Sequence, residues 1–214
     1  MHKILVLHGA GGSSTSMAQM TASLETALGP LFQFVFLDAP YYKRDGSAVW
    51  YEEPPNGRMA PTTDSSWASK SNELLDATVA EHGPFFAILG YSQGSAFATY
   101  YLSTVPDDTF QAALLFCGSL IPEHLGLMQS IDGARPLHTP AIIYSGEMDG
   151  VVPTEATLQQ AGAFSYPRVV VDPRGKHALP QPSSPSFEKV VNFVHGELLE
   201  TTDNFIYGDM SGGL

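Results

Sequence analysis

Short apolar runs alternate along the chain with segments in which apolar residues recur about every 3.6 positions. The runs predict six buried strands, near residues 4–7, 34–37, 85–89, 112–116, 141–144 and 169–171. Helical spacing marks the stretches 17–28, 69–82, 93–101 and 187–198. Continuous apolar strands separated by helices are typical of a mostly parallel sheet that is covered on both faces. We therefore predict an α/β fold with a six-stranded sheet.

Two stretches interrupt this alternation. Residues 41–68 carry aromatic side chains among Pro and Gly, and residues 119–137 form the second irregular stretch. Both follow predicted strands, so we expect small cap insertions over the carboxyl edge of the sheet, where open α/β sheets bind ligands. The chain is otherwise expected to form one domain over residues 1–200. The polar, Gly-rich segment 201–214 is expected to be a loosely ordered tail.

Charge and cysteine content narrow the possible partners. The chain has 22 acidic and 10 basic residues and a net charge of −12, so neither nucleic acid nor an anionic membrane surface is expected to bind. The single cysteine, Cys117, excludes an intrachain disulfide and a zinc site built on thiolates. Apolar runs are too short for a secretory signal or a membrane span, and we expect a cytoplasmic protein. Its oligomeric state is not predicted.

The strongest chemical motif is Gly90-Tyr91-Ser92-Gln93-Gly94, between a predicted strand and a predicted helix. A nucleophilic serine needs a tight strand-to-helix turn that exposes its hydroxyl, and glycines two residues away on each side make room for that turn. The helix N-terminus favours negative charge developing nearby. The same pentapeptide can also be a plain turn between a strand and a helix. The flanking strand and helix favour Ser92 as a nucleophile.

A serine needs a base, and the base needs an orienting acid. In folds with this kind of turn, the acid and then the histidine follow the serine at the ends of later strands. Asp149 and His177 have this order and this placement. Glu147 and Asp172 compete with Asp149 for the role of the acid. We predict the catalytic set Ser92, Asp149 and His177.

The first strand is followed by a glycine-rich turn, His8-Gly9-Ala10-Gly11-Gly12. Small residues there let backbone N–H groups approach an oxygen closely, so we predict that Ala10 and Gln93 form the oxyanion hole. A dinucleotide fingerprint is the rival interpretation, with Asp38 as the ribose ligand. It fails at its third glycine, where Ser14 stands. We expect no cofactor and no metal.

Aromatic residues of the first insertion are candidates for substrate binding. We predict an apolar cap that shelters an acyl chain, built from Tyr41, Trp50, Tyr51 and Trp67. The alternative is that these side chains only pack the insertion onto the sheet. The pattern favours neither interpretation over the other.

Together these motifs resemble the FSH1-type serine hydrolases of the α/β-hydrolase superfamily, over most of residues 3–196. The resemblance is carried by five motifs, at residues 4–9, 36–40, 83–94, 146–153 and 175–180. The chain departs from the usual family pattern at Tyr91, where Phe is common, and at Lys176, where Gly is common. Ser13 and Ser14 stand where a downstream Asn is usual.

The resemblance implies an α/β-hydrolase fold and an esterase or thioesterase with Ser92 as nucleophile, Asp149 as acid and His177 as base. It also implies a small-molecule or carrier-bound acyl substrate, including a polyketide or fatty acyl chain released from a carrier thioester. Two alternatives stay open: an acyltransferase that uses the same triad, and a catalytically silent ligand-binding hydrolase fold.

Overall fold

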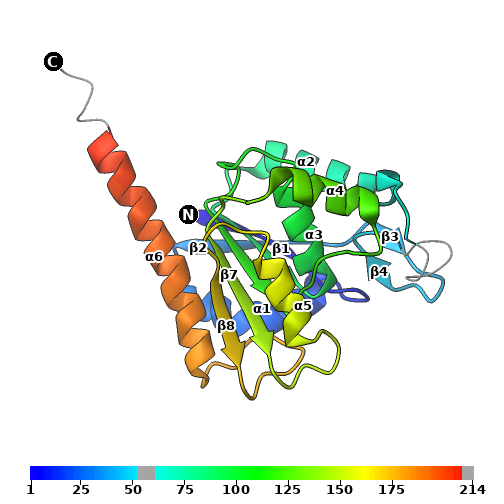
Figure 1. Cartoon of the computed structure of the whole chain (residues 1–214). Coiled ribbons are helices and arrows are strands. Elements are labelled where there is room, and N and C mark those ends of the chain that lie inside the picture. The colour runs from blue at the N-terminus through cyan, green and yellow to red at the C-terminus, as the bar shows by residue number, and fades with distance from the viewer. Residues whose placement is uncertain (53–60, 209–214) are drawn as a thin grey trace.

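A computed structural model describes residues 1–52 and 61–208. Its centre is a six-stranded, entirely parallel sheet in the order β2-β1-β5-β6-β7-β8 (Figure 1). The strands are β1 (His2–Leu7), β2 (Phe32–Leu37), β5 (Ala87–Tyr91), β6 (Ala112–Phe116), β7 (Ala141–Gly146) and β8 (Arg168–Asp172). The six predicted strands and the α/β class are confirmed.

Helices cover both faces of this sheet. They are α1 (Ser14–Leu28), α2 (Ser69–His82), α3 (Gln93–Leu102), α4 (Leu125–Ala134), α5 (Thr154–Ala161) and α6 (Pro185–Gly208). Buried residues of α2, α3, α4 and α5 pack in one core cluster, and those of α1 and α6 pack in another. The strands supply alternate residues to the two clusters: Ile88 faces the first and Leu89 the second. Both faces of each strand are therefore buried, and this explains why the strand sequences are continuously apolar.

The two insertions lie against each other. In the first, β3 (Tyr41–Tyr42) pairs with β4 (Ala48–Val49), and a 3-10 helix (Ser65–Ala68) leads into α2. The second contains α4. A parallel bridge joins Thr62 of the first insertion to His124 of the second, with Thr62 N donating to Glu123 O at 3.1 Å. Residues 53–60 of the first insertion lie outside the described residues.

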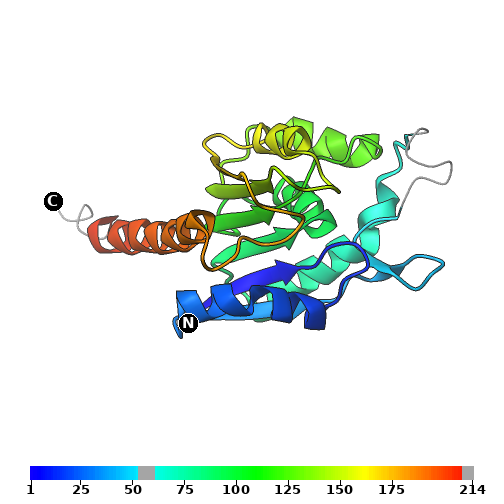
Figure 2. The ribbon, with the colours of Figure 1, turned by 90° about the horizontal axis from the view of Figure 1, so that it is seen from below.

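The C-terminal helix differs from the expectation for this segment. Helix α6 continues to Gly208 and extends past the edge of the sheet (Figure 2), so residues 201–208 are helical where a loosely ordered tail was expected. No Gly or Pro interrupts residues 197–207, and this allows the helical repeat to continue. Residues 209–214 of the expected tail lie outside the described residues.

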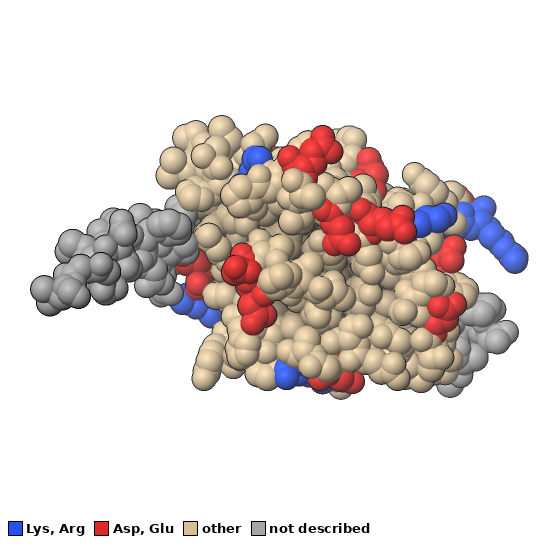
Figure 3. All heavy atoms as spheres, turned by 90° about the horizontal axis from the view of Figure 1, so that it is seen from above, with Lys and Arg blue, Asp and Glu red and all other residues tan. Residues whose placement is uncertain are grey.

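The excess of acidic residues is visible on the surface of the protein. Acidic side chains are spread over the face in Figure 3, and the basic ones lie mainly towards its edges. A search of the described helices finds none with the length and apolar character that a bilayer crossing requires.

Candidate active site

Ser92 occupies a strained turn between β5 and α3. Its backbone has φ 54° and ψ −118°, in the left-handed half of conformational space that residues other than glycine rarely adopt. Glycine is required two residues away on each side. A Cβ on Gly90 would meet the backbone of Gly94 and Ser95, and one on Gly94 would meet the carbonyl oxygens of Leu7 and His8. The turn therefore brings β5, α3 and the end of β1 into direct backbone contact.

A chain of hydrogen bonds links Ser92 to a base and an acid. Ser92 Oγ lies 3.0 Å from His177 Nε2, and His177 Nδ1 lies 2.7 Å from Asp149 Oδ2. With Asp149 ionised, Nδ1 carries the proton, which leaves Nε2 as the acceptor that faces the serine hydroxyl. The structure thus brings together the three residues that the sequence places after β5, β7 and β8. A serine hydroxyl in this arrangement can lose its proton to the imidazole as it attacks.

Asp149 is held as a carboxylate. Its side chain is 1% exposed. Burial alone would raise the pKa of Asp149, but the hydrogen bonds that the carboxylate receives from His177, Val152 N and Val151 N outweigh burial and hold the pKa below its ordinary value. The two amides donate to Oδ1 over 2.9 and 2.8 Å, respectively. Asp149 therefore stays charged near neutral pH and can stabilise an imidazolium at His177.

The loops that carry the acid and the base are tied together. Met148 N donates to Gly175 O at 2.9 Å, and a Cβ on Gly146 would clash with the backbone of Gly175. Within the described chain, His177 forms its carboxylate hydrogen bond with Asp149 and not with a rival acid. Asp172 instead accepts from Arg174 N at 3.0 Å and from Ser184 Oγ at 2.8 Å, which fixes the turn before the histidine.

The glycine-rich turn after β1 is anchored from beneath by His8, which is 1% exposed. His8 Nε2 accepts from Ala39 N at 3.0 Å, so Nδ1 carries the proton and donates to Gly9 O at 2.7 Å. Burial lowers the pKa of His8 and keeps its ring neutral. This histidine is a structural link between the turn and the Asp-Ala-Pro motif.

Asp38 belongs to the same scaffold. Its Oδ1 accepts from Ser14 N at 2.6 Å and its Oδ2 from Ser14 Oγ at 2.9 Å, at the start of α1. These hydrogen bonds, with that from Ser14 N first, lower the pKa of Asp38. The carboxylate that the dinucleotide interpretation assigns to a ribose therefore caps a helix instead.

A cavity of about 450 Å³ opens beside Ser92. Ala10 and Gln93, the two residues predicted for the oxyanion hole, both line it. Polar and apolar groups share its wall almost equally, and the apolar ones include Tyr51, Ala96, Leu120, Met128, Val151, Val152, Pro153 and Ala156. Lys43, Glu123 and Gln159 add polar groups. Segments of both insertions therefore border the space next to the nucleophile.

The four aromatic candidates have different positions. Tyr51 lines the cavity. Tyr41, Trp50 and Trp67 are not among the described residues that line it. Trp50 is fully buried, stacks on Phe97 at 5.7 Å between ring centroids, and donates from Nε1 to His8 O at 2.7 Å. Its contacts join the insertion to the core, which is the packing interpretation of this residue.

The other two aromatic residues hold the first insertion. Tyr41 is buried, and its hydroxyl accepts from Lys70 N at 3.0 Å at the start of α2. Trp67 Nε1 donates to Asp64 Oδ2 at 3.2 Å, within the 3-10 helix and its cap. For these two side chains the packing interpretation describes the contacts better than the cap interpretation.

Sequence reasoning missed the side chain of Gln93. Its Oε1 accepts from Trp50 N at 3.0 Å and its Nε2 donates to Tyr51 O at 3.4 Å, so it connects the nucleophile's helix to the first insertion. The conspicuous Ser-Gln-Gly order within the elbow was the available signal. It does not reveal a partner some 40 residues away.

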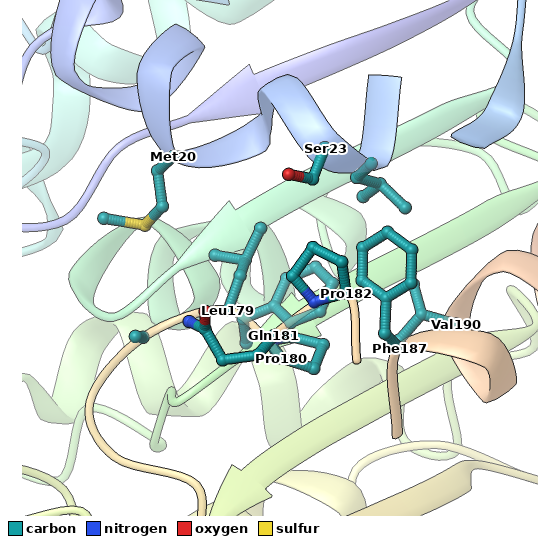
Figure 4. Close-up of a pocket in the computed structure, with 11 residues that line it drawn as sticks. Met20, Ser23, Leu179, Pro180, Gln181, Pro182, Phe187 and Val190 are labelled. Atoms are coloured by element: carbon teal, nitrogen blue, oxygen red, sulfur yellow. The ribbon is translucent and has the colours of Figure 1, made fainter. Parts of the chain in front are cut away.

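A smaller cavity of about 220 Å³ lies behind the histidine loop, between α1 and α6 (Figure 4). Met20, Leu179, Pro180 and Phe187 point into it, and Ser92 is not part of its wall. It is separate from the cavity beside the nucleophile. The segment that follows His177 forms one of its sides.

Cys117 completes the surroundings of the acid and the base. Within the described chain, one atom each of Cys117, Asp149 and His177 lie within 4.8 Å of one another, an arrangement that could in principle ligate a metal ion. Burial, followed by the charge of Asp149, raises the pKa of the Cys117 thiol to about 12. His177 already donates to Asp149 at 2.7 Å, so the trio fits a hydrogen-bonded cluster better.

Comparison with known proteins identifies the family. The sequence model described as "Serine hydrolase (FSH1)" matches residues 1–187. The chain belongs to the FSH1 serine hydrolase family. It is 26% identical over 197 residues to Esterase FUS5 of Gibberella moniliformis, covering 85% of this chain and 81% of that protein. It is 28% identical over 205 residues to Esterase OVCA2 of Bos taurus, covering 83% of this chain and 89% of that protein.

Solved structures show the same fold. Esterase PE8 superposes with a TM-score of 0.70 at 18% identity, over 91% of this chain and 92% of that one. Acyl-protein thioesterase 2 of Zea mays gives a TM-score of 0.66 at 18% identity, over 92% and 94% of the two chains. The α/β-hydrolase fold expected from the FSH1 resemblance is thereby confirmed.

Proposed function

We propose that this FSH1 family member hydrolyses acyl esters or acyl thioesters through an acyl-serine intermediate on Ser92. The observation that carries the proposal is the continuous chain from Ser92 Oγ through His177 to Asp149, beside a cavity of about 450 Å³. The family and the esterases named among its relatives support the reaction class.

In the first half of the reaction, neutral His177 Nε2 takes the Ser92 proton as Oγ attacks the acyl carbonyl carbon. The oxygen of the carbonyl becomes an oxyanion, which the backbone N–H groups of Ala10 and Gln93 stabilise. As the tetrahedral intermediate collapses, the C–O or C–S bond to the leaving group breaks, and the proton on Nε2 passes to the departing alcohol or thiol.

The second half releases the acid. His177 takes a proton from water, and the hydroxide attacks the acyl-serine ester. Collapse of the new tetrahedral intermediate breaks the bond to Oγ, and the proton on Nε2 returns to Ser92. Asp149 keeps the proton of neutral His177 on Nδ1 in both halves and faces the imidazolium when it forms.

The cavity wall supports an acyl group with an apolar chain as the substrate. Leu120, Met128 and Val152 supply apolar surface, and Tyr51 adds one aromatic ring from the first insertion. Within this class, release of a polyketide or fatty acyl chain from a carrier thioester is the finer proposal.

Intact-protein mass spectrometry after treatment with a fluorophosphonate tests the nucleophile. We expect one adduct on the parent, none on Ser92→Ala, and one on the matched control Ser103→Ala, which removes a hydroxyl at the other end of α3. Ser92→Ala should also lower turnover by about 10⁶-fold, as measured for another serine hydrolase. An adduct that persists on Ser92→Ala would refute the assignment.

Substrate class is tested with acyl esters and acyl thioesters of increasing chain length. Tyr51→Ala should change the ranking of chain lengths, because Tyr51 lines the cavity. Trp67→Ala removes an aromatic ring of the same insertion that is outside the described wall, and it should leave the ranking unchanged. Identical rankings for all three proteins would remove Tyr51 from substrate binding.

A further inference from the structure

The segment that follows His177 is buried at Leu179 and Pro180, but it borders hollows on two sides. Ala178, Leu179 and Pro180 border the 220 Å³ cavity of Figure 4. A second hollow of about 420 Å³ borders Gly175, Lys176, Ala178 and Leu179. Loosely packed loops open at low free-energy cost. The base must nevertheless keep its Nε2 within hydrogen-bond reach of Ser92.

Two side chains from neighbouring strand ends bind this segment through its backbone carbonyls. Tyr91 Oη donates to His177 O at 2.8 Å. Cys117 Sγ lies 3.4 Å from Ala178 O and 3.7 Å from Lys176 O, so its single S–H can donate to either carbonyl, and the nearby Asp149 carboxylate is a third acceptor. Three successive carbonyls are thus within reach of two donors.

The placement of these donors relates them to the nucleophile. Tyr91 directly precedes Ser92, and Cys117 directly follows β6, the strand that pairs with β5. The Tyr91 ring also lies beside the imidazole of His177, at 5.2 Å between centroids. Any shift of the histidine loop relative to Ser92 must therefore break hydrogen bonds to residues that are rigidly connected to Ser92.

We propose that Tyr91 and Cys117 are positioning residues that hold the His177 loop in register with the nucleophile. Both reach backbone carbonyls at or beside the base; the Tyr91 ring also lies beside the imidazole, and Cys117 also lies close to the side chains of Asp149 and His177. The proposal rests on the proposed function, in which His177 is the base. It assigns a role to the hydroxyl of Tyr91, the residue that directly precedes Ser92.

Steady-state kinetics on a short-chain p-nitrophenyl ester tests the tyrosine. Tyr91→Phe keeps the ring beside His177 and removes only the donor to His177 O. We expect kcat to fall by about five- to tenfold with KM unchanged, because loss of one hydrogen bond loosens the base without altering the cavity. The matched control is Tyr101→Phe, which removes a hydroxyl that donates to Asp76 at 2.8 Å, away from the site. It should lower Tm and leave kcat within twofold.

The cysteine gives an independent test. Cys117→Ala removes the donor and should lower kcat by about threefold or more, whereas Cys117→Ser restores an O–H donor and should recover part of the loss. A purely structural role would lower Tm in both variants without this ordering of kcat. A parental kcat in both Tyr91→Phe and Cys117→Ala would overturn the proposal. If one variant fails to fold, a parental kcat in the other overturns it.

One further measurement separates this proposal from the proposed function. The proton between His177 Nδ1 and Asp149 should give a far-downfield ¹H NMR resonance that reports the position of the ring whether or not the protein turns over substrate. We expect this resonance to broaden in Tyr91→Phe and Cys117→Ala and to stay sharp in Tyr101→Phe. Broadening in these variants of a parent that forms no fluorophosphonate adduct would refute the function and retain the positioning role. If the parent is active, and the resonance stays sharp and kcat stays unchanged in these variants, then the positioning role is refuted and the proposed function is retained.

Discussion

The residues that directly follow β5 and β6 have similar, positive φ angles, but their side chains lie in different chemical surroundings. Ser92 follows β5 with φ 54°, and Cys117 follows β6 with φ 49°. Each continues the sheet ladder by donating its N–H to the next strand over 2.9 Å, Ser92 to Phe116 O and Cys117 to Tyr144 O. Both turns therefore place a side chain that is nucleophilic in principle at the carboxyl edge of the sheet.

The two turns differ in their surroundings. Ser92 begins α3, lines the larger cavity and meets a histidine at 3.0 Å. Cys117 is fully buried, and its surroundings raise the pKa of its thiol to about 12. The thiol is the better nucleophile in water, but burial keeps it protonated. Under the proposed function, solvent access and the neighbouring histidine therefore decide which of the two side chains reacts, and whether that side chain carries oxygen or sulfur matters less.

The largest expected effect in this comparison concerns the hydrogen bond that orients the base. Asp149→Asn should lower kcat by about 10⁴-fold, because an amide can stabilise the wrong tautomer of His177 and cannot balance an imidazolium. Steady-state kinetics beside the parent measures the loss. A loss below tenfold would mean that His177 is oriented by its loop alone, without the acid.

The same variant tests the charge of Asp149. Because its folded pKa is lowered, its carboxylate contributes stability that is fully present well above pH 3.8, its ordinary value, and that is lost as the pH falls through the folded pKa. The difference in Tm between the parent and Asp149→Asn should therefore shrink on acidification below that value. A difference that does not vary with pH would contradict the lowered pKa.

Thiol alkylation compares the two turns directly. Raising the pKa of Cys117 from 9.0 to about 12 lowers its thiolate fraction by about 10³-fold at pH 8, so iodoacetamide should leave the native parent unmodified. Ser92→Cys places a thiol beside His177 at a helix N-terminus, where its pKa should fall, and that site should alkylate readily. Peptide mass spectrometry distinguishes the two sites, and denatured parent provides the control in which Cys117 reacts. Rapid labelling of native Cys117 would show that burial does not protect it.

The sheet and the three central site residues could be predicted because their signals are local. Each apolar run is one strand, and each of Ser92, Asp149 and His177 stands shortly after such a run within a motif of a few residues. Parallel topology then brings the strand ends to one edge. No long-range pairing has to be known for that inference, beyond the order of the motifs.

The features that escaped prediction depend on distant partners. Trp50 resembles a cap residue in sequence, but its indole N–H finds the carbonyl of His8, 42 residues earlier in the chain. Helix α5 was not predicted because polar side chains occupy its buried face. Gln160, for example, donates to Ser95 O at 3.0 Å and to Thr99 Oγ1 at 2.8 Å, so an apolar stripe is missing. Tyr91 and Cys117 gave no signal because the carbonyls that they bind are backbone groups.

Substituting the glycines near the two turns should give the smallest effects, which are changes in the free energy of unfolding. These changes compare the rigidity of the two turns. A Cβ on Gly94 would meet the carbonyl oxygens of Leu7 and His8, which are fixed by the sheet, so Gly94→Ala should destabilise the fold by about 1–3 kcal/mol or more. A Cβ on Gly118 would meet Ser95 Oγ, which can rotate away, but also Ser95 Cβ, which rotation does not move, so Gly118→Ala should also destabilise the fold by about 1–3 kcal/mol. Gly133→Ala, on α4 with no atom within 4 Å, should stabilise by about 0.5–1 kcal/mol and is the control. Urea unfolding of the three variants gives the order. Equal costs for Gly118→Ala and Gly94→Ala would confine the contrast between the two turns to solvent access and the neighbouring histidine, whereas a much smaller cost for Gly118→Ala would show that the turn after β6 is the less rigid of the two.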